Sequence, residues 1–224
     1  MGPRASVAPA ALTIEESARL VDAWAWAESH LYEVVGSWVP STAWPAAKVW
    51  LSSASQHHAW RAQLWRQRLP GRLVPAYPAA NDGPLPPDGG PAVDSGWATG
   101  GLPVTGPERP GPEGAEAALA LLGRLQGDGA RLGAYCRVIL PRTVVAYRSW
   151  QRRCAACSDR PVARALALNL ADVVADWQDG SEVLTDFLGR PGGVDELNEV
   201  AEASIELERL LMGQGLGPDS SWGR

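Results

Sequence analysis

Apolar residues recur every three or four positions through most of the chain, the spacing at which side chains share one face of an α-helix. Between residues 13 and 38 the recurring apolar positions are Ala18, Val21, Ala25, Leu31, Val35 and Trp38. Thr13 followed by Glu16 has the pattern of a capping box, and Pro40 disfavours further helix. The pattern predicts a first long helix after a flexible tail of residues 1–12.

A second periodic stretch follows after a short turn, with its apolar face at Ala47, Leu51, Ala54, Ala62, Trp65 and Leu69. Ser41 or Thr42 is suited to cap this helix, and a proline such as Pro45 is tolerated in the first turn. Pro70-Gly71 ends it. Because a short turn between long helices makes them antiparallel neighbours, we predict a helical hairpin over residues 13–70.

Residues 71–114 have a different composition, with ten prolines and ten glycines among forty-four residues and no periodicity. No regular element is expected in this segment. A loop this long is uncommon inside a domain, and one sufficient reason is geometric: it lets the chain travel the length of a helical bundle.

Helical periodicity resumes over residues 115–188, for which we predict a second helical pair. The first of these helices is expected to bend at Pro141, and Ser158 or Asp159 caps the second. An acidic helix over residues 194–213 completes the chain. The sequence therefore predicts an all-α protein, which at 224 residues fits a single domain.

Two long helices, a long crossover and two more long helices resemble the layout of ferritin-like four-helix bundles, over about residues 13–188. The resemblance implies a bundle whose second and third helices run parallel, here with an extra C-terminal helix. Proteins of that family hold two metal ions, commonly iron, with a Glu from each of two helices and a Glu-x-x-His from each of the others.

The candidate metal ligands are Glu28, His57, His58, Asp172 and Asp176, with iron or manganese as the implied metal. Glu28 lies mid-helix on the apolar stripe and matches the first-helix carboxylate. His58 continues the stripe of the second helix, and His57 lies about 100° further round. Asp172 and Asp176 share one polar column of the fourth helix. A hydrogen-bonded or arginine-paired Glu28 is the structural alternative.

The ligand set of the family is incomplete in this sequence. Ser55 stands where a Glu three residues before His58 would be, and Ala175 stands where a His after Asp172 would be. The third helix offers only Asp128, near its start. At most half of a di-metal set is therefore present.

The position of Glu28 along the hairpin also matters. Counting back from Pro40 places Glu28 opposite Ser52 and Ser53, with His58 roughly 9 Å further along. Small residues facing a carboxylate could leave a pocket for a small cationic or aromatic ligand near Trp24, or simply permit close helix packing.

Charge narrows the choice of partners. The net charge of −5 argues against a general affinity for nucleic acid. Nine arginines lie between residues 124 and 164, and eleven acidic residues lie between 172 and 208. These stretches either pair with each other or offer an arginine surface to an acidic protein partner. The many tryptophans favour core packing, or in part a homo-oligomer face.

Other motifs add little. Cys154-x-x-Cys157 lacks the second pair that a structural zinc site needs. No apolar run reaches the roughly 20 residues of a membrane span, and no signal peptide is recognisable. With three cysteines, a cytoplasmic location is expected.

The sequence leaves two functional hypotheses. The first is a ferritin-like bundle without a complete di-metal centre and without a cofactor, which acts as a binding or assembly protein. The alternative is a metal-dependent oxidase or hydroxylase with an atypical or reduced metal site.

Overall fold

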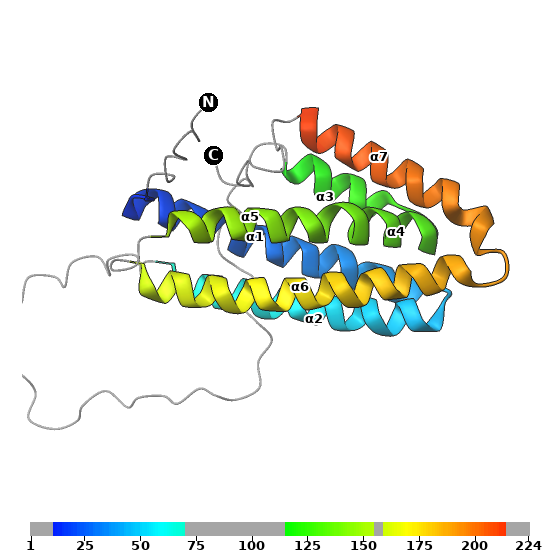
Figure 1. Ribbon diagram of the computed structural model, residues 1–224, viewed down its shortest axis with the longest axis horizontal. Coiled ribbons are helices and arrows are strands. Elements are labelled where there is room, and N and C mark those ends of the chain that lie inside the picture. Colours follow the sequence, from blue (N-terminus) through cyan, green and yellow to red (C-terminus); the bar gives the residue numbers. More distant parts are fainter. Residues whose placement is uncertain (1–10, 70–114, 155–158, 214–224) are drawn as a thin grey trace, which may run out of the picture. The chain divides into compact units, whose positions relative to one another are not determined.

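The computed structural model describes residues 11–69, 115–154 and 159–213, and the regular elements in these ranges are all helical (Figure 1). They are α1 (Ile14–Trp38), η1 (Val39–Ser41), α2 (Pro45–Arg66), α3 (Ala115–Arg124), α4 (Asp128–Ala134), the π-helix η2 (Tyr135–Ile139), α5 (Leu140–Arg153), α6 (Arg160–Gly189), η3 (Gly193–Glu196) and α7 (Leu197–Gly213). The prediction of an all-α chain is confirmed for this part. The predicted crossover, residues 71–114, and most of the predicted tail lie outside the described residues.

The first hairpin begins as the sequence predicts, because Thr13 and Glu16 form a capping box at the start of α1. The predicted cap of α2 is wrong. The Thr42 hydroxyl donates to the Trp38 carbonyl at 2.9 Å, so it completes the preceding turn and does not cap α2. The free N–H groups at the start of α2 are met by Asp128, whose carboxylate accepts from the backbone of Trp44 at 2.8 Å. A distant residue therefore caps this helix.

The predicted third helix is interrupted twice. Residues 125–127 separate α3 from α4, and Gly127 has a φ of 79°, which glycine adopts without strain. This break was not expected. The bend expected at Pro141 takes the form of the π-turns of η2 directly before it. Proline cannot donate a backbone hydrogen bond, and π-bulges are one of the ways in which a helix accommodates a local disruption.

The direction of the helices follows from their aromatic contacts. Trp50 of α2 lies 5.5 Å, between ring centroids, from Tyr135. Further along both segments, Trp65 lies 5.8 Å from Tyr147. Residue numbers therefore rise in the same direction along α2 and along the continuous segment α4–η2–α5, which we call the α4–α5 rod. Helix α2 runs parallel to this rod. The long connection between them matches this requirement.

Helix α6 runs antiparallel to α2. Near the start of α2, Trp44 packs on Phe187, and near its middle His57 contacts Asp176. The two helices approach closely at Gly180, where an added Cβ would lie 2.4 Å from the Trp50 ring. Gly180 therefore permits the spacing that brings polar side chains of α2 and α6 into contact.

Large aromatic side chains fill the core between these helices. Trp24, Trp38 and Trp65 are at most 1 % exposed. Truncation of a core tryptophan to alanine costs about 3–5 kcal/mol, so these rings fix the helix positions strongly. Of the nine tryptophans in the described residues, five are buried and two more pack against the core, in agreement with the expected core role.

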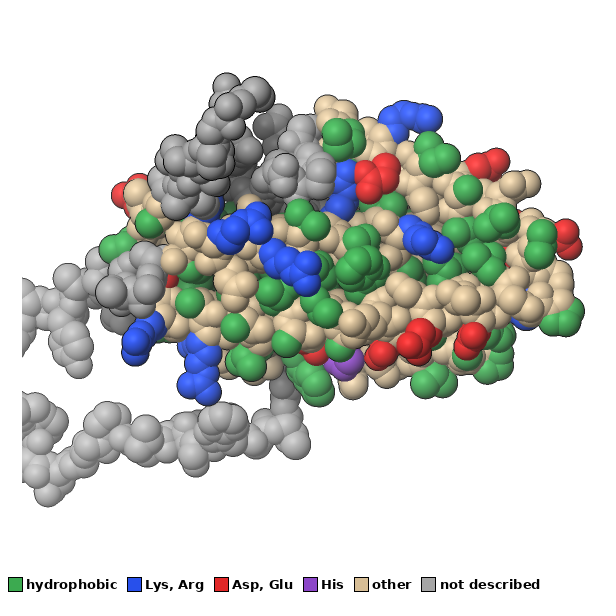
Figure 2. Space-filling view, viewed as in Figure 1, with side chains coloured by type: hydrophobic (Ala, Val, Ile, Leu, Met, Phe, Trp, Pro, Cys, Tyr) green, Lys and Arg blue, Asp and Glu red, His purple; other side chains and the backbone are tan. Residues whose placement is uncertain are grey.

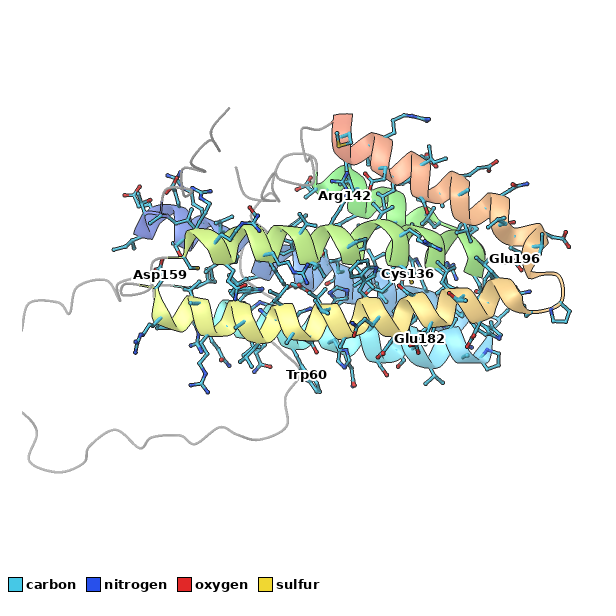
Figure 3. All side chains as sticks on the ribbon, viewed as in Figure 1. Trp60, Cys136, Arg142, Asp159, Glu182 and Glu196 are labelled. Carbon is cyan, nitrogen blue, oxygen red and sulfur yellow. The ribbon has the colours of Figure 1, made fainter. Side chains whose placement is uncertain are left out.

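Helix α7 packs mainly on α4 and also on α3. Arg142, on the α7 side of α5 in Figure 3, donates from Nε to Glu208 at 3.0 Å. This ion pair joins the arginine-rich and the acidic parts of the sequence. Among the described residues, no helix has the length and apolar character needed to cross a membrane.

Candidate functional site

Polar side chains from α1, α2, η2, α5 and α6 meet in the middle of the helices, where an apolar core would be expected. This polar cluster consists of Glu28, His57, His58, Arg61, Tyr135, Tyr147, Asp172 and Asp176. We call Glu28, His58, Tyr135 and Tyr147 its inner half, and His57, Asp172 and Asp176 its outer half. Arg61 joins the two halves.

Glu28 lies at the centre of the inner half and is completely buried. Its Oε2 is 2.5 Å from His58 Nδ1 and 3.0 Å from Arg61 Nε, and its Oε1 accepts from the Tyr147 hydroxyl at 2.6 Å. Burial alone raises the pKa of a carboxyl group, but Arg61 and His58 lower the pKa of Glu28 to about 2. Glu28 is therefore a fully hydrogen-bonded carboxylate.

His58 uses both ring nitrogens inside the protein. Its Nδ1 faces Glu28, and its Nε2 is 2.6 Å from the Tyr135 hydroxyl. Burial is the largest cause that lowers the pKa of His58, followed by the charge of Arg61, so the imidazole is neutral. A carboxylate can only accept, so Nδ1–H donates to Glu28 and Nε2 accepts from Tyr135. The 3.0 Å contact of Arg61 with Nδ1 is then a packing contact.

Arg61 is the only strongly basic side chain of the cluster, and it is 1 % exposed. Its Nε donates to Glu28, and its Nη1 donates to Asp172 at 2.5 Å and to Asp176 at 2.7 Å. Burial lowers the pKa of an arginine, but Glu28 and Asp176 raise the pKa of Arg61 well above its ordinary value. One guanidinium therefore holds carboxylates from α1 and α6 together.

The outer half lies at the edge of the cluster, between α2 and α6. The side chains of His57 and Asp172 are 31 % and 34 % exposed, whereas that of Asp176 is 4 % exposed. Nδ1 of His57 is 2.6 Å from Oδ1 of Asp176. The His57 ring also packs beside Trp60, which projects from α2 and is 60 % exposed (Figure 3). His57 and Asp172 are accessible from solvent, unlike the groups of the inner half.

Two tyrosines, Tyr135 of η2 and Tyr147 of α5, border the inner half on the side of the α4–α5 rod. Burial raises the pKa of both Tyr135 and Tyr147 well above the ordinary value, so both hydroxyls stay protonated. Trp65 donates from Nε1 to the Tyr147 hydroxyl at 3.0 Å. Tyr135 is the first residue of the π-helix, a deviation that is frequent at functional sites.

A groove of about 730 Å³ opens beside the outer half. It is lined by Pro45, Ala46, Val49, Trp50, Ser53, His57, Asp176 and Asp179. The lining combines apolar side chains of α2 with the imidazole of His57 and the carboxylates of Asp176 and Asp179. This volume is in the range of small-molecule sites.

The polar cluster does not fit a di-metal centre. The carboxylates from α1 and α6 that such a centre would use each have an oxygen that accepts a hydrogen bond from Arg61. Neither ring nitrogen of His58 is free to bind a metal. A cation is already present at the centre, and the protein itself supplies it.

One combination of the predicted ligands remains suited to a metal. His57, Asp172 and Asp176 each offer a ligand atom, and these atoms lie within 4.8 Å of one another. Of the five predicted residues, three therefore gather in the outer half, while Glu28 and His58 lie in the inner half.

The predicted offset between Glu28 and His58 is wrong, because these side chains are in direct contact. Residues 39–44 form a 3₁₀ turn and an extended connection, so the midpoint of the hairpin lies beyond Pro40. Accordingly, Gly36 faces Ser55, whose hydroxyl would lie 3.0 Å from a Cβ at Gly36. His58 and Arg61 therefore occupy the level of Glu28, where the sequence placed small residues that could leave a pocket or permit close helix packing.

Arg61, Tyr135 and Tyr147 were missed by the sequence reasoning. Arg61 could have been found, because it follows His58 by three residues and shares its face of α2. The predicted alternative of an arginine-paired Glu28 is the arrangement observed. The tyrosines carried no such signal, since buried tyrosines are common in cores without any polar partner nearby in sequence.

The two cysteines in the described residues take no part in the cluster. Cys136 is buried, and burial raises its pKa. Cys154 is half-buried, with a pKa raised to about 11 by the same cause, and Cys157 lies outside the described residues. A protonated thiol is a poor nucleophile and metal ligand.

The chain matches no known protein family model, and neither the curated proteins nor the solved structures include a significant match. The functional interpretation therefore depends on the geometry of the polar cluster and of the groove.

Proposed function

We propose that this chain is a ferritin-like four-helix bundle that acts as a small-molecule-binding protein and has no oxygen-activating di-metal centre. The parallel course of α2 and the α4–α5 rod, with α6 antiparallel to α2, supports this arrangement, and α7 is then the extra helix. The position of Arg61 is the observation that carries the functional proposal.

The guanidinium of Arg61 takes the place that metal cations take in ferritin-like enzymes, between carboxylates of facing helices. A pair of metal ions could occupy this central position only if the buried Arg61 side chain left it, and Arg61 would then lose all three carboxylate partners. Removal of one partner of a buried charge pair costs about 3–5 kcal/mol. The cluster therefore acts as a structural core that holds α1, α2 and α6 in register.

The groove beside the outer half is the proposed binding site. Val49 offers apolar surface for the body of a ligand, and His57, Asp176 and Asp179 offer polar groups in the same lining. Val49 is 69 % exposed, so a ligand that covered it would gain from the burial of apolar surface. A small aromatic molecule with a polar group at one end suits this lining.

Metal content tests the absence of the di-metal centre. The purified protein is expected to contain far less than two equivalents of iron or manganese and to lack the absorption bands of an oxo-bridged iron pair. About two equivalents of tightly bound iron or manganese per chain would overturn the proposal.

A fragment screen by ligand-observed NMR, with neutral and cationic aromatic compounds, tests the groove. Ser53→Trp places a large side chain in the groove and should abolish binding of the fragments found. Ser52→Trp is the matched control, because Ser52 is also exposed but does not line the groove. Fragments that bind the Ser53→Trp variant unchanged would show that the groove is not the binding site.

The alternative, a metal-dependent oxidase or hydroxylase, keeps support from the outer half only. The three ligand atoms there could hold one ion, which is fewer than the family's two. Turnover of oxygen by the purified, metal-loaded protein would favour this alternative over a binding function.

A further inference from the structure

We propose that the outer half binds one divalent transition-metal ion, through His57, Asp172 and Asp176. This ion would lie beside the groove, which His57 and Asp176 line. The inference deepens the proposed function and rests on it, because the ion would form part of the ligand-binding groove.

The distances are suitable for a single ion. Nitrogen and oxygen ligands lie about 2.1 Å from zinc, so neighbouring ligand atoms of a tetrahedral site lie about 3.4 Å apart. The three candidate atoms already lie within 4.8 Å of one another. His57 Nδ1 and Asp176 Oδ1 form a 2.6 Å contact and would separate slightly to admit the ion. His57 and Asp172 are about one-third exposed and have room to adjust, while Arg61 holds Asp176 in place.

Asp172 and Asp176 each keep one carboxylate oxygen that does not bind Arg61. Asp172 and Asp176 each accept from Arg61 through Oδ2. Oδ1 of Asp176 contacts only the His57 ring, and Oδ1 of Asp172 has no hydrogen bond among the described residues. A metal ion between these oxygens and the imidazole would keep both bonds to Arg61 intact. Arg61 would then orient the ligands, as groups around a metal site commonly do.

Charge balance favours a divalent cation at this position. Arg61 shares its single positive charge among the three carboxylates of Glu28, Asp172 and Asp176, so these four side chains carry two more negative charges than positive ones. Asp176 is almost fully buried, where excess negative charge is costly. A divalent ion with a neutral His57 would neutralise this excess.

The ligand types narrow the choice of metal. One imidazole with two carboxylates suits zinc, manganese or iron(II) better than the oxygen-only sites that magnesium and calcium prefer. Three protein ligands leave at least one coordination position for water or for a bound molecule. Figure 2 shows a histidine side chain beside a row of acidic side chains on the visible face of the helices. The adjoining groove would bring a ligand to the open position.

Equilibrium titration of the metal-free protein with zinc or manganese chloride tests the inference. The expected result is one equivalent bound per chain, with affinity lowered at least about tenfold in His57→Ala and in Asp172→Asn. Asp179→Asn is the matched control, because it removes an exposed carboxylate of the same helix and groove that is not among the three ligands. Circular dichroism spectra would verify that each variant is folded.

The outcomes separate this inference from the proposed function. One equivalent that depends on His57 and Asp172 supports the site. No binding at millimolar metal, or binding that both variants retain, overturns the site and leaves the groove as a metal-independent binding site. Two equivalents that survive in both variants would overturn the absence of a di-metal centre as well.

Discussion

The two halves of the polar cluster contain similar residue types but differ in how completely their hydrogen bonds are satisfied. In the inner half both oxygens of Glu28 and both nitrogens of His58 have partners inside the protein. In the outer half, His57 and Asp172 are accessible to solvent, and Oδ1 of Asp172 has no partner among the described residues. The inner half is built to stabilise the fold, and the outer half keeps groups available for a ligand.

Substitution of Arg61, which joins the two halves of the polar cluster, is the most direct test of their difference. Arg61→Leu would leave Glu28, Asp172 and Asp176 close together without their common cation, and we expect the free energy of unfolding to fall by about 3–5 kcal/mol. Urea denaturation measures this change. Arg66→Leu is the control, because Arg66 is exposed and donates to Ser29 at the surface, and it should cost well under about 1 kcal/mol. Equal, small losses in both variants would show that Arg61 does not hold the cluster together.

Acid should weaken the inner half before the rest of the fold. The pKa of His58 is lowered on folding, so below about pH 6.5 the unfolded chain binds a proton that the folded protein excludes, and stability falls. Glu28 then adds a loss between its ordinary pKa of 4.5 and its folded pKa of about 2, worth about 3 kcal/mol in full. Urea denaturation at a series of pH values measures both. A free energy of unfolding that is constant from about pH 7 to pH 5 would contradict a buried neutral His58.

The contribution of the Glu28 charge to stability can be measured with a side chain of nearly the same size and shape. Glu28→Gln keeps the volume but weakens the bond to Arg61 and disturbs the bonds from His58 and Tyr147, so we expect a loss of about 1.5–3 kcal/mol. Glu33→Gln, at an exposed position of the same helix, is the control and should change stability by less than about 0.5 kcal/mol. Thermal and urea unfolding of both variants make the comparison.

The smallest effect is expected in the outer half. His57→Ala should lower the stability of the metal-free protein by no more than about 1 kcal/mol, because the imidazole is partly solvated and its contact with Asp176 lies at the edge. Urea denaturation in the presence of a chelator gives the value. A loss as large as that of Glu28→Gln would mean that the two halves are not energetically distinct.

The sequence was sufficient to predict most of the secondary structure, because apolar periodicity and the signals that start and end helices depend on residues that are close together in the chain. The capping box at Thr13 and the end of the first long helix before Pro40 are as predicted. The break at Gly127 and the cap supplied by Asp128 were not predicted; the cap depends on a residue 84 positions distant in sequence, which local patterns do not reveal.

The candidate site was anticipated in part. A mid-helix carboxylate on an apolar stripe requires a partner, and this requirement made Glu28 conspicuous from its position in the sequence. The choice between a metal and an arginine as that partner could not be made from the sequence. It depends on the true midpoint of the hairpin, which shifts His58 and Arg61 to the level of Glu28.

By itself, the sequence determined that the chain forms long amphipathic helices and that candidate polar ligands lie at helical spacing on three of them. Only the tertiary structure decided which of these groups meet, because their contacts join residues 30 to 119 positions apart. The free energy of a buried charge depends on its neighbours within a few ångströms, and sequence periodicity specifies the face of a helix but not its axial register against the next. That register placed Arg61 among the carboxylates and left His57 at the edge.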